Sequence, residues 1–308
     1  MLRARTLAAL FFLLTLTVSG QNPAPLAPVF HPTPPLPSYD VATIKPADTA
    51  GVILPNGGRR ITPGTTARAY IRTAYAPGAG LLTPVQVIGG PDWIDKDRYV
   101  IDGKAPADLE VAMQKMNTTD RIQHDHAMRQ SLLAERFHLK VHFEVREMPV
   151  YALVPAKGGL KIKAVADPAP VPPADAQSPG TSSPRAAALS IRMGAGGAME
   201  LRATAISIAQ FASLIGPLIN QTPGFISLAD TGNRPIVDQT GFTGNFDLVG
   251  FKWSAPQSTA ADADANTSTS DLPALTTALE ETLGLKLVST KGPVEVIVID
   301  SIDHPSEN

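Results

Sequence analysis

The chain has 308 residues, a length that suits two domains of ordinary size joined by linkers. The formal net charge is −2, from 26 Lys and Arg against 28 Asp and Glu, so the basic field that nucleic-acid binding needs is missing. Cysteine is absent, which excludes disulfides, thiolate metal ligands and a cysteine nucleophile. A hydrophobic content of 44% is enough for substantial cores.

The first 20 residues have the pattern of a cleavable signal peptide. Arg3 and Arg5 form a basic start, residues 7–18 are apolar, and Val18-Ser19-Gly20 is a small-residue cleavage site. A single membrane anchor is the alternative, but the apolar run is shorter than the ~20 residues that span a bilayer. We therefore expect cleavage before Gln21, no membrane span afterwards, and a mature protein that is periplasmic or secreted.

Proline-rich stretches divide the remaining chain. Residues 21–37 are predicted to form a stiff, extended tether, and residues 166–188 an interdomain linker of Pro, Ala and Ser. A first unit then covers residues 38–165 and a second covers residues 189–308. Within the second unit, residues 254–271 are polar, have no periodicity and are expected to be a mobile loop.

The first unit mixes strands and helices. Its second helix ends near Phe137 and has an apolar stripe that includes Leu133. A two-residue turn is expected at Asn56-Gly57, because both central residues of such a turn need positive φ. The predicted strands are at 39–44, at 52–54 and 59–62 on either side of this turn, and at 85–88 and 98–102. Helices are expected at 66–75 and 122–137, and a closing hairpin pairs 138–145 with 148–154.

The second unit repeats this order. It has strands at 189–193 and 199–203 around a glycine-rich turn, a helix at 207–219, strands at 235–237 and 245–249, a helix with Leu272, Leu275, Leu279 and Leu283 on one stripe, and a closing hairpin of 285–289 with 294–300. The two helix-to-strand blocks keep one offset, since 285 − 139 = 146 and 297 − 151 = 146. We therefore predict an α+β fold of two tandem repeats, each an antiparallel sheet with two helices packed on one face. Leu133 should superpose on Leu279, and Tyr151 on Ile297.

Several separate motifs together resemble one protein family. They are Gly89-Gly90-Pro91-Asp92-Trp93 and residues 132–137, 146–153, 237–247, 283–287 and 291–295. In this order they are similar to an uncharacterised secreted family expanded in soil acidobacteria, catalogued as a domain of unknown function. The resemblance covers most of residues 38–306 and implies export and a family-specific fold, without an activity. Some relatives look fused to antirepressor-type sensor metallopeptidases, which points to sensing or binding outside the cytoplasm.

Two residues are candidates for ligand binding. Trp93 follows a Gly-Gly-Pro turn; exposed, it would suit stacking on a glycan or peptide, and buried, which we favour, it would close the first core. Arg129 lies within the apolar stripe of its helix, where the second repeat has Leu275. We expect the stem of Arg129 to pack while its guanidinium reaches solvent. An anion site facing a cleft is the alternative.

Motifs for metals, cofactors and catalysis are missing from the sequence. His124 and His126 lie about 200° apart on a helix, so they cannot chelate one ion from one face, and His126 is expected to pack in the core. Asp262, Asp264 and Asn266 resemble the start of a calcium loop, but the glycine and the final glutamate of such a loop are absent. No nucleophile elbow or phosphate loop occurs. We therefore expect no metal, no cofactor and no catalytic residue.

The sequence favours an exported, non-catalytic binding or sensor module of the cell envelope. Exposed edges of antiparallel sheets suit the addition of a strand from an envelope protein or peptide. The alternative is an envelope hydrolase that acts on glycan or peptide through Asp92, Asp95 and Asp97. That mechanism requires at least two of these carboxylates in one cleft, with a perturbed pKa.

Overall fold

The computed structural model describes residues 28–49, 59–78, 81–116, 118–166, 189–194, 197–220, 234–254 and 272–306. The predicted signal peptide, the Asn56-Gly57 turn, nearly all of the predicted linker and nearly all of the predicted loop lie outside these ranges. The described residues form a mixed α/β fold of several sheets, and none of their helices is long and apolar enough to cross a membrane.

The first half of the chain builds an antiparallel sheet covered by helices. Its strand order is β1 (Val41–Ala47), β4 (Arg98–Lys104) and β2 (Arg59–Thr66), and its helices are α1 (Ala67–Ala74), α2 (Trp93–Lys96), α3 (Ala107–Lys115) and α4 (Thr118–Arg136). Helix α1 begins where the Thr66 hydroxyl accepts a hydrogen bond from the Ala69 backbone N–H at 3.3 Å. Tyr70, Leu133 and Phe137 are buried between α1, α4 and the sheet.

The second half builds a second antiparallel sheet with its own core. The strand order is β6 (Ala164–Val165), β10 (Asn245–Ser254), β8 (Ala198–Ser207) and β7 (Leu189–Met193). Helix α5 (Ile208–Asn220) packs here, as does α6 (Leu275–Ala278), which continues as the π-helical turn η4 (Leu279–Leu283). Phe211, Phe246 and Trp253 are fully buried in this core. The predicted pairing of residues 189–193 with 199–203 is confirmed.

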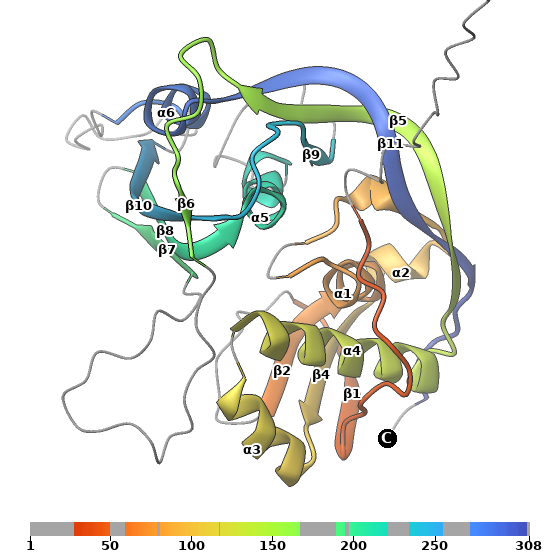
Figure 1. Cartoon of the computed structure of the whole chain (residues 1–308). Coiled ribbons are helices and arrows are strands. Elements are labelled where there is room, and N and C mark those ends of the chain that lie inside the picture. The colour runs from red at the N-terminus through yellow and green to blue at the C-terminus, as the bar shows by residue number, and fades with distance from the viewer. Residues whose placement is uncertain are drawn as a thin grey trace, which may run out of the picture.

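A third sheet joins the two halves. Its order is β3 (Val87–Gly89), β11 (Leu285–Ser301), β5 (Lys140–Pro155) and β9 (Ile236–Asp238), and a short 3-10 turn, η1 (Pro84–Gln86), precedes β3. Strands β5 and β11 pair antiparallel over almost their whole length, forming a ribbon that arches from one half to the other (Figure 1). Strand β3 is parallel to β11 and β9 is parallel to β5, so this sheet is mixed rather than antiparallel.

The two closing hairpins that the sequence predicts do not form, because their residues belong to the ribbon. Residues 138–154 and 285–300 do not fold back on themselves, because each forms one long strand that pairs with the other. Pro149 pairs with Lys291 and Pro293 with Glu147, in the part of the ribbon that lies between the attachments of β3 and β9. A proline there removes no ladder bond to a third strand, so both prolines are tolerated without a turn.

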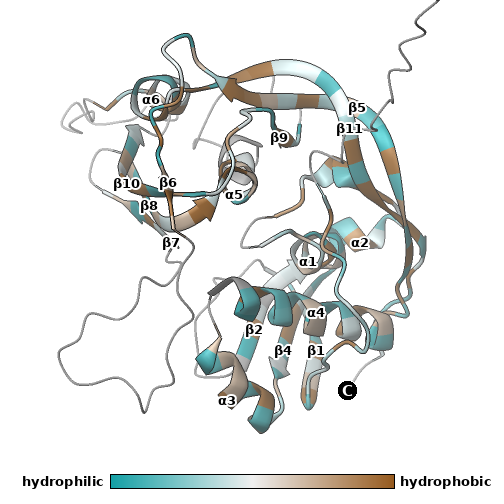
Figure 2. Ribbon diagram, in the orientation of Figure 1, coloured by the Kyte–Doolittle hydropathy of each residue, from teal (hydrophilic) through white to brown (hydrophobic). Residues whose placement is uncertain are grey.

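Each core is completed by a strand from the other half of the chain. Ile297 and Ile299 of β11 are buried in the core of the first half, and Leu153 of β5 is buried in the core of the second. Along the ribbon, hydrophobic residues alternate with hydrophilic ones (Figure 2). The predicted units are therefore not closed by their own C-terminal strands.

The described part of the predicted tether lies on the body instead of standing away from it. Val29 is only 4% exposed and belongs to the first core. The Phe30 backbone N–H donates to the Tyr75 carbonyl at 2.9 Å, and the Ser131 hydroxyl donates to the Pro37 carbonyl at 2.8 Å. The buried side chain of Val29 and these hydrogen bonds hold the segment against the body. The tether prediction relied on proline content, which carries no information about these contacts.

Candidate functional site

A cavity of about 450 Å³ lies between the two halves. Its walls come from the N-terminal segment 28–31, from residues 77–78 and 81–86 after α1, from α4 at Gln123, and from α5 and β9 of the second half. The volume falls in the range of ~300–1,000 Å³ that is usual for small-molecule sites. Apolar side chains, including Phe30, Leu82 and Ile236, form much of the wall.

Small residues on one face of α5 leave this space open. Ala209, Ala212, Ser213 and Gly216 line the cavity and are spaced 3, 1 and 3 residues apart, which places them on one side of a helix. The core face of the same helix has the large side chain of Phe211. This stripe of small residues was visible in the sequence and could have marked the cavity wall.

The N-terminal wall of the cavity is held by hydrogen bonds. Glu295 of β11 accepts a bond from the Val29 backbone N–H at 2.8 Å with one carboxylate oxygen, and its other oxygen lies 2.8 Å from His31 Nε2. The Phe30 carbonyl accepts a bond from Gln130 Nε2 at 3.3 Å. Residues 28–31 are thus held by α4 of the first half and by β11.

Three polar side chains in the cavity wall keep unused hydrogen-bonding groups within the described part of the chain. Gln123 makes no side-chain hydrogen bond there, and Gln210 uses only its Oε1, which accepts from the Ser207 backbone N–H at 3.0 Å. Asp238 Oδ1 accepts from Thr240 N at 2.9 Å and Thr240 Oγ1 at 2.8 Å, while Oδ2 has no partner among the described residues. Sequence reasoning missed all three, although Asp-x-Thr after a strand is a local turn signal.

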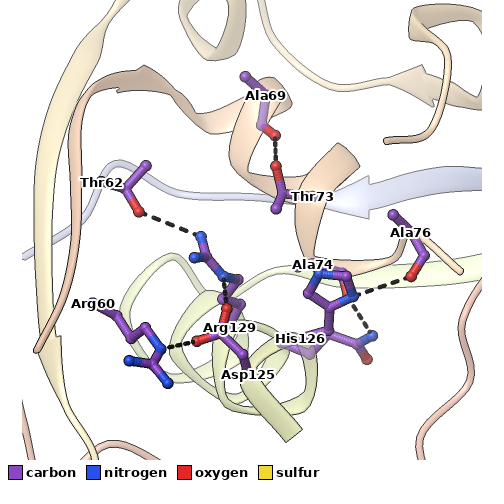
Figure 3. A network of polar contacts seen from close by, with 10 residues as sticks. Arg60, Thr62, Ala69, Thr73, Ala74, Ala76, Asp125, His126 and Arg129 are labelled. Carbon is purple, nitrogen blue, oxygen red and sulfur yellow. Dashed lines mark hydrogen bonds and ion pairs between the residues drawn. The ribbon is translucent and has the colours of Figure 1, made fainter. Parts of the chain in front are cut away.

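Arg129 lies in a buried ion-pair network rather than in the cavity wall. Its Nε donates to Asp125 Oδ2 at 2.9 Å, and Arg60 Nε donates to Asp125 Oδ1 at 2.8 Å (Figure 3). Arg129 Nη1 lies 3.3 Å from the Thr62 hydroxyl, and its guanidinium lies over the Tyr70 ring at 5.1 Å. We expected the guanidinium of Arg129 to reach solvent, but only 12% of the side chain is exposed. The expectation was wrong because Asp125 pairs with the guanidinium inside the protein.

The network keeps Asp125 charged. Burial by itself would raise the pKa of the Asp125 carboxyl, but the adjacent Arg129 and Arg60 outweigh burial and hold the pKa below its ordinary value. One carboxylate therefore compensates two guanidinium groups, which links α4 to β2. This arrangement is structural in geometry, because each charged group already has a protein partner.

His126 satisfies the end of α1. Its Nδ1 lies 3.1 Å from the Ala76 carbonyl (Figure 3). Gln130 Nε2 donates to the Ala74 carbonyl at 2.9 Å. The carbonyls at a helix C-terminus lack partners within the helix, so these contacts complete α1. Burial, followed by the nearby Arg129 charge, lowers the pKa of His126 from 6.5 to about 4. His126 packs in the core, as the sequence predicts.

Trp93 begins α2 and is half-buried against the first core. Its ring stacks on His304, with ring centroids 4.0 Å apart and an interplanar angle of 24°. Neither Trp93 nor Arg129 lines the cavity between the halves. Their role in binding remains a prediction.

The three aspartates near Trp93 have three different partners. Asp92 pairs with Lys96 at 3.1 Å, Asp95 with Arg68 at 2.6 Å, and Asp97 with His304 at 3.2 Å. Asp97 lines a pocket of about 350 Å³ beside Tyr99, and neither Asp92 nor Asp95 is among the described residues that line it. Among the residues that the structure describes, no group of three or more His, Asp or Glu side chains is arranged to hold a metal ion.

The chain belongs to the family described as protein of unknown function (DUF3738), whose model matches residues 68–302. The match begins within α1, after β1 and β2, and covers β4, the whole second sheet and the whole β5–β11 ribbon. No curated protein and no solved structure is significantly similar to the chain.

Proposed function

We propose that the protein is an exported, non-catalytic binding or sensor module of the cell envelope, and that its ligand binds in the cavity between the halves. The observation that carries this proposal is the combination of about 450 Å³ of space, a largely apolar wall, and a few polar groups without partners. Small-molecule sites commonly have this composition. Export is supported by the signal-peptide pattern and by the resemblance to a secreted family of soil acidobacteria.

We further infer that the two halves are copies of one unit whose long C-terminal strands have been exchanged. The register of the ribbon supports this inference, because Glu147 pairs with Pro293 and 293 − 147 = 146, the same offset that relates the two halves in sequence. Tyr151 and Ile297 would then be equivalent, and each pairs with a short parallel strand, β9 or β3. A ligand in the cavity would touch both copies.

A protein or peptide partner could be added at β7, which is the edge strand of its sheet. Ile191 and Met193 of β7 are 42% and 70% exposed, although each pairs with a buried residue of β8. An apolar edge of this kind supports strand addition by an envelope protein or peptide. None of the described residues of β7 lines the cavity, so this partner would leave the cavity free.

The binding proposal is tested with the neutral dye Nile red, whose fluorescence rises in apolar sites. We expect the full-length protein to bind the dye, and Ser213→Leu to weaken binding because the larger side chain fills the cavity. Thr277→Leu, on the exposed face of α6, is the control and should bind like the wild type. Equal binding by all three proteins would place the dye outside the cavity and contradict the proposal.

Catalysis is tested separately by incubating the protein with fragments of envelope glycan and peptide. We expect their masses to stay unchanged. A change in mass that Asp97→Asn abolishes would favour the hydrolase instead.

A further inference from the structure

The charges around the cavity are unbalanced. Its wall contains no Lys or Arg among the described residues, and it contains one carboxylate, Asp238. The only histidine of the wall, His31, already contacts Glu295. An anionic ligand would therefore lose its hydration without gaining a cationic partner, which is costly in a largely apolar site.

The Asp238 carboxylate is held in a fixed orientation. Thr240 donates two hydrogen bonds to Oδ1, from its backbone N–H at 2.9 Å and its hydroxyl at 2.8 Å, so the carboxylate is anchored through one oxygen. Oδ2 makes no bond to any described residue, and Asp238 lies at the end of β9 in the cavity wall. A fixed carboxylate with a free oxygen is an acceptor for a ligand N–H group.

The other residues of the cavity wall indicate which further chemical groups the ligand should have. Phe30, Leu82 and Ile236 supply apolar surface, and Gln123 and Gln210 supply amides that can donate to a ligand oxygen or nitrogen. A ligand with an apolar or aromatic body and a nitrogen donor at one end would satisfy both parts of the wall. The neutral amides of Gln123 and Gln210 can bind cationic, neutral or anionic ligands. Selectivity for a cation therefore depends on Asp238.

We propose that the cavity is selective for organic ammonium compounds, in which a charged amine is attached to an apolar or aromatic body, with Asp238 as the residue that determines this specificity. This inference rests on the proposed binding function and adds the chemical class of the ligand. Coulomb attraction near a protein surface amounts to several kcal/mol at contact before the cost of desolvation. A net preference of about tenfold, or about 1.4 kcal/mol, for a cation over a matched anion is therefore a modest expectation.

The experiment compares three probes of similar size and shape at pH 7: 2-phenylethylamine, 2-phenylethanol and phenylacetate. Each is titrated into the full-length protein by ligand-observed NMR. We expect 2-phenylethylamine to bind about tenfold more tightly than phenylacetate, with 2-phenylethanol between them. Asp238→Asn keeps an oxygen that can accept from Thr240, and it should reduce the preference for the amine over phenylacetate.

The outcomes separate this inference from the function on which it rests. Equal or tighter binding of phenylacetate by the wild type would overturn the ammonium preference, and so would a preference that survives Asp238→Asn. If Asp238→Asn does not fold, the wild-type comparison of amine with carboxylate still decides. Failure of all three probes to bind, or binding that Ser213→Leu does not weaken, would refute the cavity as a ligand site and the inference with it.

Discussion

Gly284, at the junction of η4 and β11, should be among the least replaceable residues of the chain. Its φ is +65°, in the left-handed region, and a Cβ at this position would lie 2.0 Å from the Gly159 carbonyl oxygen and 2.9 Å from Lys161 N. The segment after β5 crosses here and is hydrogen-bonded to the junction: Ala156 N donates to the Gly284 carbonyl at 2.8 Å, and Lys161 N to the Leu283 carbonyl at 3.0 Å.

The expected cost of Gly284→Ala is the sum of two effects. The left-handed conformation costs a residue with a Cβ about 1–2 kcal/mol. In addition, the crossing segment must move away, because a contact of 2.0 Å with a backbone oxygen cannot be relieved by rotating a side chain. The movement disrupts two hydrogen bonds, each of which contributes about 1 kcal/mol. We therefore expect Gly284→Ala to lower the free energy of unfolding by roughly 3–4 kcal/mol.

Neighbouring glycines separate the two effects. Gly159 has φ +75° but nothing within 4 Å of a built Cβ, so Gly159→Ala should cost only the backbone strain, about 1–2 kcal/mol. Gly158 has an open surrounding and no positive φ, so Gly158→Ala should be close to neutral. Urea unfolding followed by circular dichroism measures all three. A cost for Gly284→Ala no larger than that for Gly159→Ala would refute the close-approach argument.

The remaining predictions concern buried polar groups and the exchanged strands. Because the His126 pKa in the folded state is about 4, below the ordinary 6.5, the unfolded state binds more protons between these values. Stability should then fall by up to roughly 3 kcal/mol as the pH is lowered from 6.5 to 4, and His126→Gln should flatten this slope in unfolding titrations. Asp125→Ala leaves two guanidinium groups without their shared carboxylate and should cost about 3–5 kcal/mol, whereas Arg60→Ala, at a side chain 31% exposed, should cost about 1 kcal/mol, both from urea midpoints. Ile297→Ala should cost about 2–5 kcal/mol and speed amide exchange in α1, since Ile297 fills the first core; faster exchange confined to the second half would contradict the exchanged packing.

Local sequence signals identified most of the elements. The helix expected at 66–75 is α1 at Ala67–Ala74, and the stripe of Leu275, Leu279 and Leu283 is buried as its spacing predicts. The two strands that flank the glycine-rich sequence, β7 and β8, also pair as expected. These features depend on periodicity, caps and turns within a short window, which is the information that a sequence carries directly.

Strand pairing could not be predicted in the same way. The alternation at 138–154 and 285–300 correctly indicated extended chain, but it suits pairing within each segment as well as pairing between the two segments. The two arrangements differ in contacts more than a hundred residues apart in sequence. Lys291-Gly292-Pro293 has the residues of a turn, but in the structure no residue at 146–149 or 291–293 has positive φ and the strand continues through both positions.

The candidate site was only partly accessible from the sequence. Asp125 and Arg129 are four residues apart, so their ion pair on one helix face could have been expected. The cavity could not, because its walls come from the N-terminal segment, α4, α5 and β9, and no pattern within one of these segments reveals the others. The stripe of small residues on α5 marks one wall without showing what lies opposite.

The polar side chains of α4 explain why the first half differs from the second at the cavity. If the halves are equivalent, His126 and Arg129 stand where the second half has Leu272 and Leu275. Replacing apolar residues by buried polar ones lowers stability unless every group is satisfied. Here His126 contacts the carbonyl of Ala76 at the end of α1, and Arg129 is paired with Asp125. Gln130 on the same helix donates to the carbonyls of Ala74 and of Phe30, which lines the cavity. The polar face of α4 thus places the N-terminal wall of the cavity, and a change that made α4 as apolar as α6 would remove the groups that hold that wall.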